Sequence, residues 1–404
     1  VEWCRSIGRK DDDIFKCLSV ARDGAPEFVP SEDSPKLDSA RLPLPCTVAE
    51  IDFNTVRRYR FIINTILPEG VTFLNGYAKT GKSRLILQMC LAVCWGVPFL
   101  GYATTKSDVL YCALEDEMAD FAPRLEMMLQ GQPAPKNFYY YTKEAFDNKP
   151  PRLGEKGGLA QLISQAIEAH PGISLVCVDV FGGIRSEKER FMDFTDYERK
   201  DLDELIKLAA DFQIALVIAH HVGKNGEKSM AVGNDFMGSG AGSFTIPATV
   251  HSVWYLARDR DDEKRMMLAY RGRRIKSGSL AMRDEYPRFN LEGDWEAITF
   301  AEDPAVATIK YLVREFGQWR GTAKQLVEVN QENEDLPPII KKPNKNTIEK
   351  FARQLQSIGI RYIQHSNGNA SPTHEFIRAD MDDNKFTEMP DYEGLEWEEV
   401  VKEE

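Results

Sequence analysis

Residues 73–85 have the sequence FLNGYAKTGKSRL, and this stretch decides the fold. It ends an apolar, strand-like run, turns on Gly76 and Gly81, and then enters a helical pattern. Residues 76–83 fit the motif GxxxxGK[ST] in full, with the strand before it and the helix after it that the motif requires. The sequence therefore predicts an α/β fold that binds the phosphates of a nucleotide.

Each fixed position of this phosphate loop has a chemical reason. The glycines let the backbone wrap around a β-phosphate, so that successive N–H groups and the positive end of the following helix face the anion. Lys82 is expected to reach the β- and γ-phosphates, and the Ser83 hydroxyl to ligate Mg²⁺. The expected cofactors are therefore ATP and Mg²⁺. The predicted nucleotide-binding residues in the loop are Gly76, Lys79, Thr80, Gly81, Lys82 and Ser83.

Acidic residues follow two further strand-like runs. Asp179 ends ISLVCVD, and Glu115 follows VLYCAL with Asp116 and Glu117 behind it. The carboxyl ends of parallel strands line the ligand crevice, so both acids are expected beside the phosphate loop. Asp179 is predicted to hold Mg²⁺ through water, and Glu115 to activate the attacking water.

Two histidines, His220 and His221, end another strand-like run, ALVIAHH. A polar residue at this point is expected to contact the γ-phosphate and to report its presence to neighbouring loops. The alternative is that either histidine simply caps the strand edge. No other histidine or cysteine cluster has the spacing of zinc ligands, so the metal ligands expected are Ser83 and, through water, Asp179.

Short apolar runs alternate with amphipathic ones from about residue 56 to 300. This alternation predicts a parallel-rich sheet with helices on both faces. The predicted strands are Val71–Asn75, Val109–Leu114, Leu175–Val180, Ala215–Ala219, Ser252–Ala257 and Met266–Tyr270. The predicted helices are Ser83–Val93, Leu159–His170 and Tyr197–Phe212.

The order of these motifs resembles that of RecA-like ATPases. Over about residues 56–295 it is most similar to the RepA and DnaB type of hexameric helicase core and its phage and plasmid relatives. By position, the resemblance implies that Glu115 is the catalytic glutamate and Asp179 the Walker B aspartate. It also implies that His220 or His221 is the phosphate-sensing histidine.

The resemblance further implies a homo-oligomeric ring, a hexamer, whose ATP sites lie between subunits. In that family a neighbouring subunit supplies a basic finger near the end of the core. The segment AYRGRRIKSG offers several cations after a strand, and the family pattern selects Arg271 and Arg273. The alternative is a solvated basic hairpin.

Loops after the Asp179 and His220 strands grip single-stranded DNA in such rings. Here these loops are FGGIRSEKER and HHVGKNGEKSMAVGNDFMGSGAGS, and mobile basic loops suit contacts with the phosphate backbone. Their cations are Arg185, Lys188, Arg190, Lys224 and Lys228. Because the first loop also carries acids and aromatic residues are few, single-stranded DNA as a partner rests mainly on the resemblance.

The remaining sequence divides into flanking parts. Residues 1–55 are expected to be an N-terminal appendage and linker, 56–300 the ATPase core, and 301–380 a winged-helix-like domain. The last is outlined by helices at Val306–Phe316, Thr322–Val329 and Asn346–Ile358 and strands at Ile360–Gln364 and His374–Arg378. Its third helix would enter the major groove of duplex DNA, or the domain would instead dock a protein. The basic residues there are Lys341, Lys342, Lys345, Lys350, Arg353 and Arg361.

Charge is unevenly distributed along the 404 residues. Of the net charge of −12, residues 380–404 carry −9, which leaves about −3 for the rest and does not exclude a nucleic-acid partner. The acidic tail, residues 381–404, is predicted to be disordered. It is expected to bind a protein partner, to compete with DNA, or only to solubilise the chain.

Composition also bounds the location of the protein. No run of about 18 apolar residues exists, so no membrane span is expected. The seven cysteines form no CxxC pair, which favours buried free thiols and a cytoplasmic protein.

Three functions are compatible with these features. The first is an ATP-driven, ring-forming DNA helicase or translocase that serves replication of a phage, plasmid or other mobile element. The second is a DNA-binding regulatory or loading ATPase that switches state without unwinding. The third is a nucleotide-dependent scaffold with no nucleic-acid role.

Overall fold

A computed structural model describes residues 46–187, 193–222, 245–259, 262–340, 343, 345–366 and 371–379. The chain divides into two units, Val1–Arg58 and Tyr59–Glu404. In the first unit the described residues contain the 3₁₀ helix η1 (Val48–Glu50). Most of the predicted N-terminal appendage and the predicted acidic tail lie outside the described residues.

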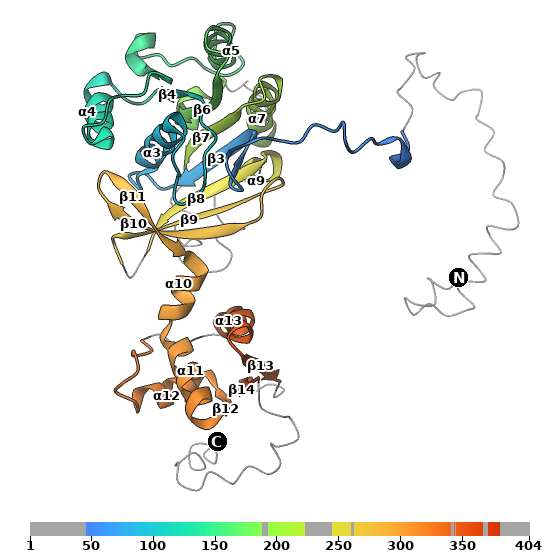
Figure 1. The fold of residues 1–404 in the computed structure, drawn as a ribbon, viewed down its shortest axis with the longest axis vertical. Coiled ribbons are helices and arrows are strands. Elements are labelled where there is room, and N and C mark those ends of the chain that lie inside the picture. The colour runs from blue at the N-terminus through green and yellow to red at the C-terminus, as the bar shows by residue number, and fades with distance from the viewer. Residues whose placement is uncertain are drawn as a thin grey trace, which may run out of the picture. The chain divides into compact units, whose positions relative to one another are not determined.

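The second unit is built on a nine-stranded sheet with the order β11-β10-β9-β8-β3-β7-β6-β4-β5 (Figure 1). β8, β3, β7, β6, β4 and β5 pair in parallel, whereas β9, β10 and β11 continue the sheet in antiparallel fashion. The parallel strands are β3 (Gly70–Gly76), β4 (Asp108–Ala113), β5 (Phe138–Thr142), β6 (Ile173–Asp179), β7 (Ala215–His221) and β8 (Ser252–Arg258). The antiparallel ones are β9 (Arg265–Gly272), β10 (Gly278–Glu285) and β11 (Arg288–Asp294).

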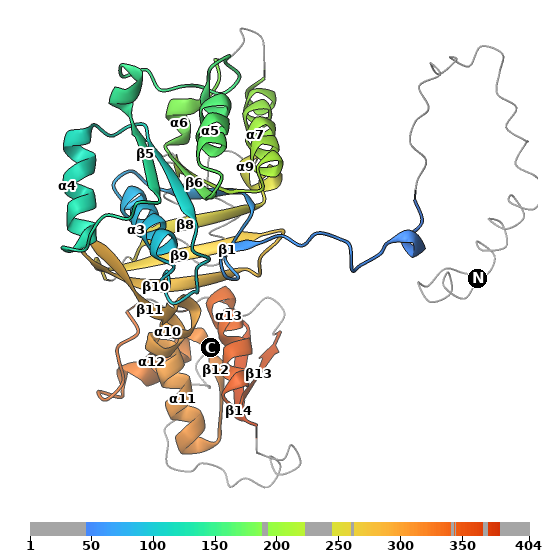
Figure 2. The same cartoon turned by 45° about the horizontal axis from the view of Figure 1, so that its top comes forward.

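Helices cover both faces of this sheet, because the central strands are apolar on both faces (Figure 2). One apolar core joins the sheet to α3 (Lys82–Trp95) and α4 (Met118–Leu129). A second core joins the opposite face to α5 (Leu159–Ala169), α6 (Phe181–Ile184), α7 (Phe194–Asp211) and α9 (Thr245–Thr249). The predicted RecA-like α/β core with a parallel-rich sheet is therefore confirmed.

Several elements of the core were not predicted. α4 contains Pro123 in its interior and buries only Phe121 and Met128, so its apolar pattern is weak. β10 and β11 carry many charged residues and form a hairpin that adds to the antiparallel end of the sheet. A short hairpin of β1 (Phe61–Ile63) and β2 (Leu67–Pro68) precedes the core strands, and the 3₁₀ helix η2 (Lys143–Phe146) follows β5.

The C-terminal part has an apolar core of its own. Its elements are α11 (Pro304–Phe316), β12 (Gln318–Thr322), α12 (Ala323–Gln331), α13 (Lys345–Ser357), β13 (Ile360–His365) and β14 (Thr373–Arg378). The three strands form an antiparallel sheet with the order β12-β14-β13. All three predicted helices and both predicted strands are present, and β12 is an addition. The winged-helix interpretation stays a prediction.

Helix ends in this part follow capping chemistry. Asp303 accepts hydrogen bonds from the first N–H groups of α11, where Pro304 occupies the first turn. Thr322 and Gln325 form a reciprocal capping box at the start of α12.

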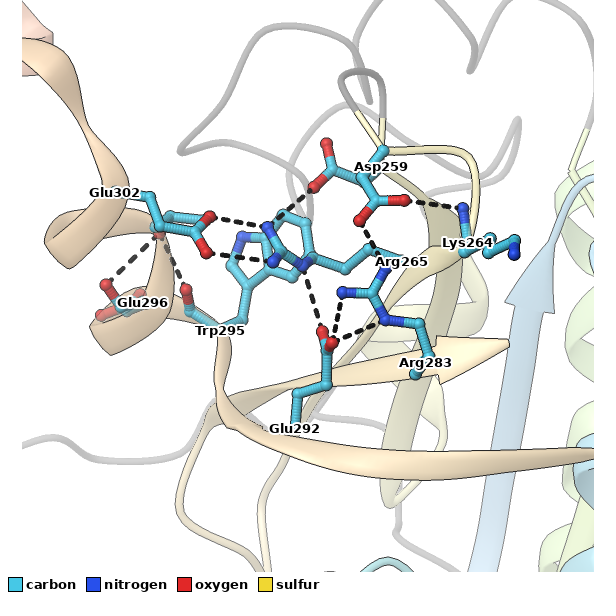
Figure 3. Close-up of polar contacts among 10 residues, drawn as sticks. Asp259, Lys264, Arg265, Arg283, Glu292, Trp295, Glu296 and Glu302 are labelled. Atoms are coloured by element: carbon cyan, nitrogen blue, oxygen red, sulfur yellow. Dashed lines mark hydrogen bonds and ion pairs between the residues drawn. The ribbon is translucent and has the colours of Figure 1, made fainter. Parts of the chain in front are cut away.

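The connecting helix α10 (Trp295–Glu302) is held to the antiparallel end of the sheet by charges (Figure 3). Arg265 of β9 donates two hydrogen bonds to Glu302, at 2.7 and 3.0 Å, and one to Glu292 at 3.1 Å. Arg283 of β10 donates to the same Glu292 at 2.7 Å. We call this group, Arg265, Arg283, Glu292 and Glu302, the α10 clamp.

Two sequence expectations about composition can be compared with the structure. Within the described ranges, no helix is both long and apolar enough to cross a membrane. Among the cysteines in those ranges, all five are free; Cys46 is exposed and the others are buried.

Candidate nucleotide-binding site

The phosphate loop connects the end of β3 to the start of α3, as predicted. Both of its glycines are required by geometry. A Cβ at Gly76 would lie 2.8 Å from the carbonyl oxygen of Leu256, which is backbone and cannot move aside easily. Gly81 has φ +92°, and a Cβ there would also lie 2.8 Å from the Phe289 ring.

Lys82 lies inside the curve of this loop, with 4% of its surface exposed. Its Nζ donates hydrogen bonds to the carbonyl oxygens of Gly76 (2.9 Å) and Tyr77 (2.6 Å) and lies 3.0 Å from Nδ1 of His221. Burial lowers the pKa of Lys82 to about 8, although the charges of Asp179 and Glu115 oppose that shift. The ammonium is therefore positioned where the motif predicts contact with phosphates.

Asp179 ends β6 directly beside Ala113 of β4, and it is 6% exposed. Its Oδ2 accepts a hydrogen bond of 3.0 Å from the hydroxyl of Tyr111. Burial raises the pKa of Tyr111, so that hydroxyl stays protonated and acts as the donor. Tyr111 was missed from the sequence; the available signal was a tyrosine in an otherwise aliphatic strand, two residues before the end of β4.

Glu115 follows β4 in the turn that leads to α4. Its Oε2 lies 3.9 Å from Nε2 of His221, whose other ring nitrogen faces Lys82. Partial burial, and then the charge of Asp179, raise the pKa of Glu115 above its usual value. The structure thus brings Lys82, His221 and Glu115 into one chain of contacts.

The two acids after Glu115 are held by cations. Asp116 accepts two hydrogen bonds from Arg124, at 2.7 and 3.2 Å. Glu117 pairs with Lys143 at 2.8 Å. Since both acids already have a basic partner, the geometry favours Glu115 as the residue that faces the nucleotide.

The two histidines lie on opposite faces of β7, because side chains alternate along a strand. His220 contacts the rings of Phe73 and Phe181, with centroid distances of 6.1 and 5.6 Å. Burial, followed by the charges of His221 and Arg185, lowers the pKa of His220 to about 4. The structure therefore brings His221 to the phosphate loop and packs His220 among aromatic rings on the other face.

The predicted finger residues lie away from the phosphate loop of their own chain. β9 runs antiparallel to β8, so Arg271 and Gly272 lie level with the first residues of β8. Gly272 pairs with Ser252, which lies level with Thr72, four residues before the loop. At about 3.3 Å per residue, this is roughly 13 Å along the strand. The backbone N–H of Arg273 donates to His251, and its guanidinium donates to the carbonyl oxygen of Ala248.

The predicted DNA-contacting cations are mostly outside the described residues, namely Lys188, Arg190, Lys224 and Lys228. Arg185 is described and is engaged within its own chain. Its Nε donates to Asp201 at 3.2 Å, and its guanidinium lies 4.1 Å from the centroid of the Tyr197 ring. Arg185 is therefore the weakest of these DNA-contact candidates.

In the C-terminal part, Lys341 and Lys342 lie outside the described residues. Lys345, Lys350 and Arg353 lie on α13, and their side chains are outside the described set. Arg361 lies on β13 and not on the third helix, so it belongs to the β13–β14 hairpin.

The oxygen donors at the site fit Mg²⁺. Ser83 begins α3 beside the buried Lys82, and Asp179 is close enough for its charge to act on that lysine. Mg²⁺ keeps several waters and is usually held by one or two protein side chains together with substrate phosphates, which matches one hydroxyl and one carboxylate. Within the described residues, no cluster of three or more His, Cys, Asp or Glu could hold a metal by itself.

Comparisons with known proteins agree with this geometry. Residues 39–227 match a family model described as an AAA domain. Among solved structures, the chain is similar to the ATPase domain of a phage helicase, with a TM-score of 0.42 and 12% identity over 55% of this chain and 85% of that one. No curated protein matches the chain. The AAA-domain match supports the RecA-like P-loop ATPase that the motif order predicts.

Proposed function

We propose that this chain, a RecA-like P-loop ATPase of the RepA and DnaB type, hydrolyses ATP as a ring of subunits and uses the energy to move along or unwind DNA. The observation that carries the proposal is the convergence of Lys82, Asp179, Glu115 and His221 at the carboxyl end of the parallel sheet. We further infer from the resemblance that the activity serves replication of a phage, plasmid or other mobile element.

Each residue at the site has a chemical role in hydrolysis. Lys82 and the loop N–H groups bind the β- and γ-phosphates, and Ser83 and Asp179 hold Mg²⁺, which when bound neutralises phosphate charge. Glu115 accepts a proton from the attacking water, and its raised pKa brings it closer to the pH at which a base transfers protons efficiently. His221 contacts both Lys82 and Glu115, which suits a residue that responds to the γ-phosphate.

The position of Arg271 and Arg273 supports a site shared between subunits. Because both lie far along the sheet from their own phosphate loop, a finger role requires a neighbouring copy. An arginine supplied in this way stabilises the charge of the transferring phosphoryl group. A ring of identical subunits would complete every site.

DNA binding is proposed for two parts of the chain. The loops after β6 and β7 would hold single-stranded DNA, and the C-terminal module would contact duplex DNA as a winged helix. The order α11, β12, α12, α13, β13, β14 and the sheet order β12-β14-β13 favour the winged-helix interpretation.

A second candidate function is a DNA-binding regulatory or loading ATPase that switches state without unwinding. The compact C-terminal module with its own core favours it, since such a module suits attachment to duplex DNA or to a protein. Both functions share the ATP site, and they differ in what the energy of hydrolysis does.

The test combines turnover with strand displacement. We expect the ATPase rate of the full chain to rise when single-stranded DNA is added, and a forked duplex to be separated. Lys82→Ala should abolish both activities, because the loop loses its side-chain charge on the phosphates. DNA-stimulated ATPase without strand displacement would favour the switching ATPase. Unchanged turnover in Lys82→Ala would contradict the proposed ATP site.

A further inference from the structure

Tyr111 places a hydroxyl where packing alone does not call for one. Its ring is 1% exposed and belongs to the apolar core that joins the sheet to α3 and α4. Phe121 is an aromatic neighbour, with ring centroids 6.0 Å apart. Phenylalanine would fill the same volume, and a buried hydroxyl costs free energy unless it is hydrogen-bonded.

The hydroxyl is bonded to a carboxylate of the candidate site. Tyr111 donates to Oδ2 of Asp179 over 3.0 Å, and both side chains are almost fully buried. The register of β4 and β6 explains the contact: Tyr111 pairs with Cys177 and Ala113 with Asp179, so the two side chains share one face and lie two residues apart along it. The tyrosine reaches forward along its strand to the carboxylate.

We infer that Tyr111 is a positioning residue for Mg²⁺ binding, because its hydroxyl fixes one oxygen of Asp179 and leaves the other turned toward the phosphate loop. This inference rests on the proposed ATPase function. A carboxylate has two oxygens and can accept from the tyrosine and still accept from metal-bound water. A hydrogen bond to an ionised acceptor is stronger than one between neutral groups, so it restrains the carboxylate rotamer effectively.

Neighbouring charges reinforce this arrangement. Arg124 pairs with Asp116 and is close enough for its charge to interact with Tyr111 and Asp179. Tyr111 and the Arg124–Asp116 pair thus form a polar layer behind the two acids that face the nucleotide. Partners of metal-binding groups in such a layer affect metal affinity by roughly 10- to 100-fold when removed.

The test is Tyr111→Phe, with the affinity of a fluorescent ATP analogue measured in EDTA and across a Mg²⁺ titration. We expect unchanged affinity in EDTA and a Mg²⁺ half-saturation concentration raised by about tenfold. Tyr102→Phe is the matched control, since it removes a tyrosine hydroxyl that lies 3.0 Å from that of Tyr270 and has no printed contact with either carboxylate's partner, Tyr111. The control should behave as wild type.

A double variant separates positioning from a general structural effect. In an Asp179→Asn background, Tyr111→Phe should add no further change in Mg²⁺ dependence, because the two residues act as one unit. An unchanged Mg²⁺ half-saturation in Tyr111→Phe, or an equal shift in the Asp179→Asn background, would overturn the inference and leave the proposed ATPase standing. A wild-type chain that fails to bind the analogue with Mg²⁺ would instead overturn the proposed function and this inference with it.

Discussion

Lys82 and Glu115 are joined through His221, and this chain of contacts sets the behaviour of the site one residue at a time. Lys82 satisfies its charge with two backbone carbonyl oxygens and the histidine ring. Glu115 is more exposed than Lys82 and keeps its carboxylate beside the other ring nitrogen. The lysine is thus built into the loop, whereas the glutamate remains accessible to a water molecule.

Glu115→Gln should retain ATP binding and lose hydrolysis. The amide keeps the shape of the side chain but cannot accept a proton, so we expect turnover to fall by about 10²-fold or more. Phosphate release and binding of a fluorescent ATP analogue measure the two effects separately. Glu117→Gln is the matched control, because Glu117 pairs with Lys143. If Glu115→Gln turns over near the wild-type rate, the base lies elsewhere, with Asp116 the next candidate.

His220 makes the stability of the fold depend on pH. Its pKa in the folded chain is about 4, below its usual 6.5, so the unfolded chain takes up the proton first as pH falls. Stability present at pH 7 is therefore lost as pH drops from about 6.5 toward 4. Between pH 7 and about 5, this histidine should remove about 2 kcal/mol from the free energy of unfolding.

The measurement is the urea midpoint of the wild type and of His220→Asn at both pH values. The variant should lose less stability on acidification than the wild type. His251, whose pKa is also lowered to about 4 by burial and by two arginines, accounts for part of the remaining slope. Equal losses in the two proteins would show that His220 is not the buried neutral group.

Among the elements, the buried parallel strands were the most predictable. β3, β4, β6 and β7 each match the predicted runs to within two residues, because a strand covered on both faces is apolar throughout. The phosphate loop, Asp179 and Glu115 were predictable for a related reason: strand ends fix where they lie.

Other features depend on contacts that no local pattern reveals. The hairpin of β10 and β11 is charged, and ion pairs such as Arg84–Asp284 fasten it to α3. The role of Tyr111 depends on the register between β4 and β6, which is set by tertiary pairing. The choice of His221 over His220 depends on which face of β7 meets the loop.

The α10 clamp should contribute measurably to stability. Arg265 has only 14% of its side chain exposed and contacts Glu302, Glu292 and Asp259. We expect Arg265→Ala to lower the free energy of unfolding by about 2 kcal/mol, because the variant leaves partly buried carboxylates without their cation. Lys324→Ala is the control: its pair with Glu328 spans one helical turn with the lysine 74% exposed, and its loss should cost at most about 0.5 kcal/mol.

Denaturant midpoints of the two variants provide the comparison. Limited proteolysis provides a second readout, since cleavage near α10 should become faster in Arg265→Ala only. Equal, small changes in both variants would mean that the clamp is as weak as an ordinary surface pair.

At the scale of the whole molecule, the sheet separates two functions along its strands. The phosphate loop follows the carboxyl end of β3, and the predicted finger follows β9 at the other end of the neighbouring strands. On the proposed function, each chain therefore offers a phosphate loop to one neighbour and a finger to another.

Mixing two inactive variants tests this division. Arg273→Ala keeps an intact phosphate loop, and Lys82→Ala keeps an intact finger, so mixed assemblies contain some complete sites. A finger contributes about 10³-fold or more to turnover in related phosphate chemistry, so the recovered ATPase rate should stand clearly above that of either variant alone. Variants that co-assemble yet remain inactive together would place the finger in its own subunit or nowhere.

The antiparallel turn of β9 has a consequence for symmetry. Two surfaces that differ cannot be matched by a two-fold axis, so the proposed contacts must run head to tail. An open row of such chains always leaves one loop and one finger unmatched at its ends, whereas a closed circle leaves none. Turnover per chain would then rise with closure as well as with concentration, and a substitution at one edge would silence only the neighbour on that side.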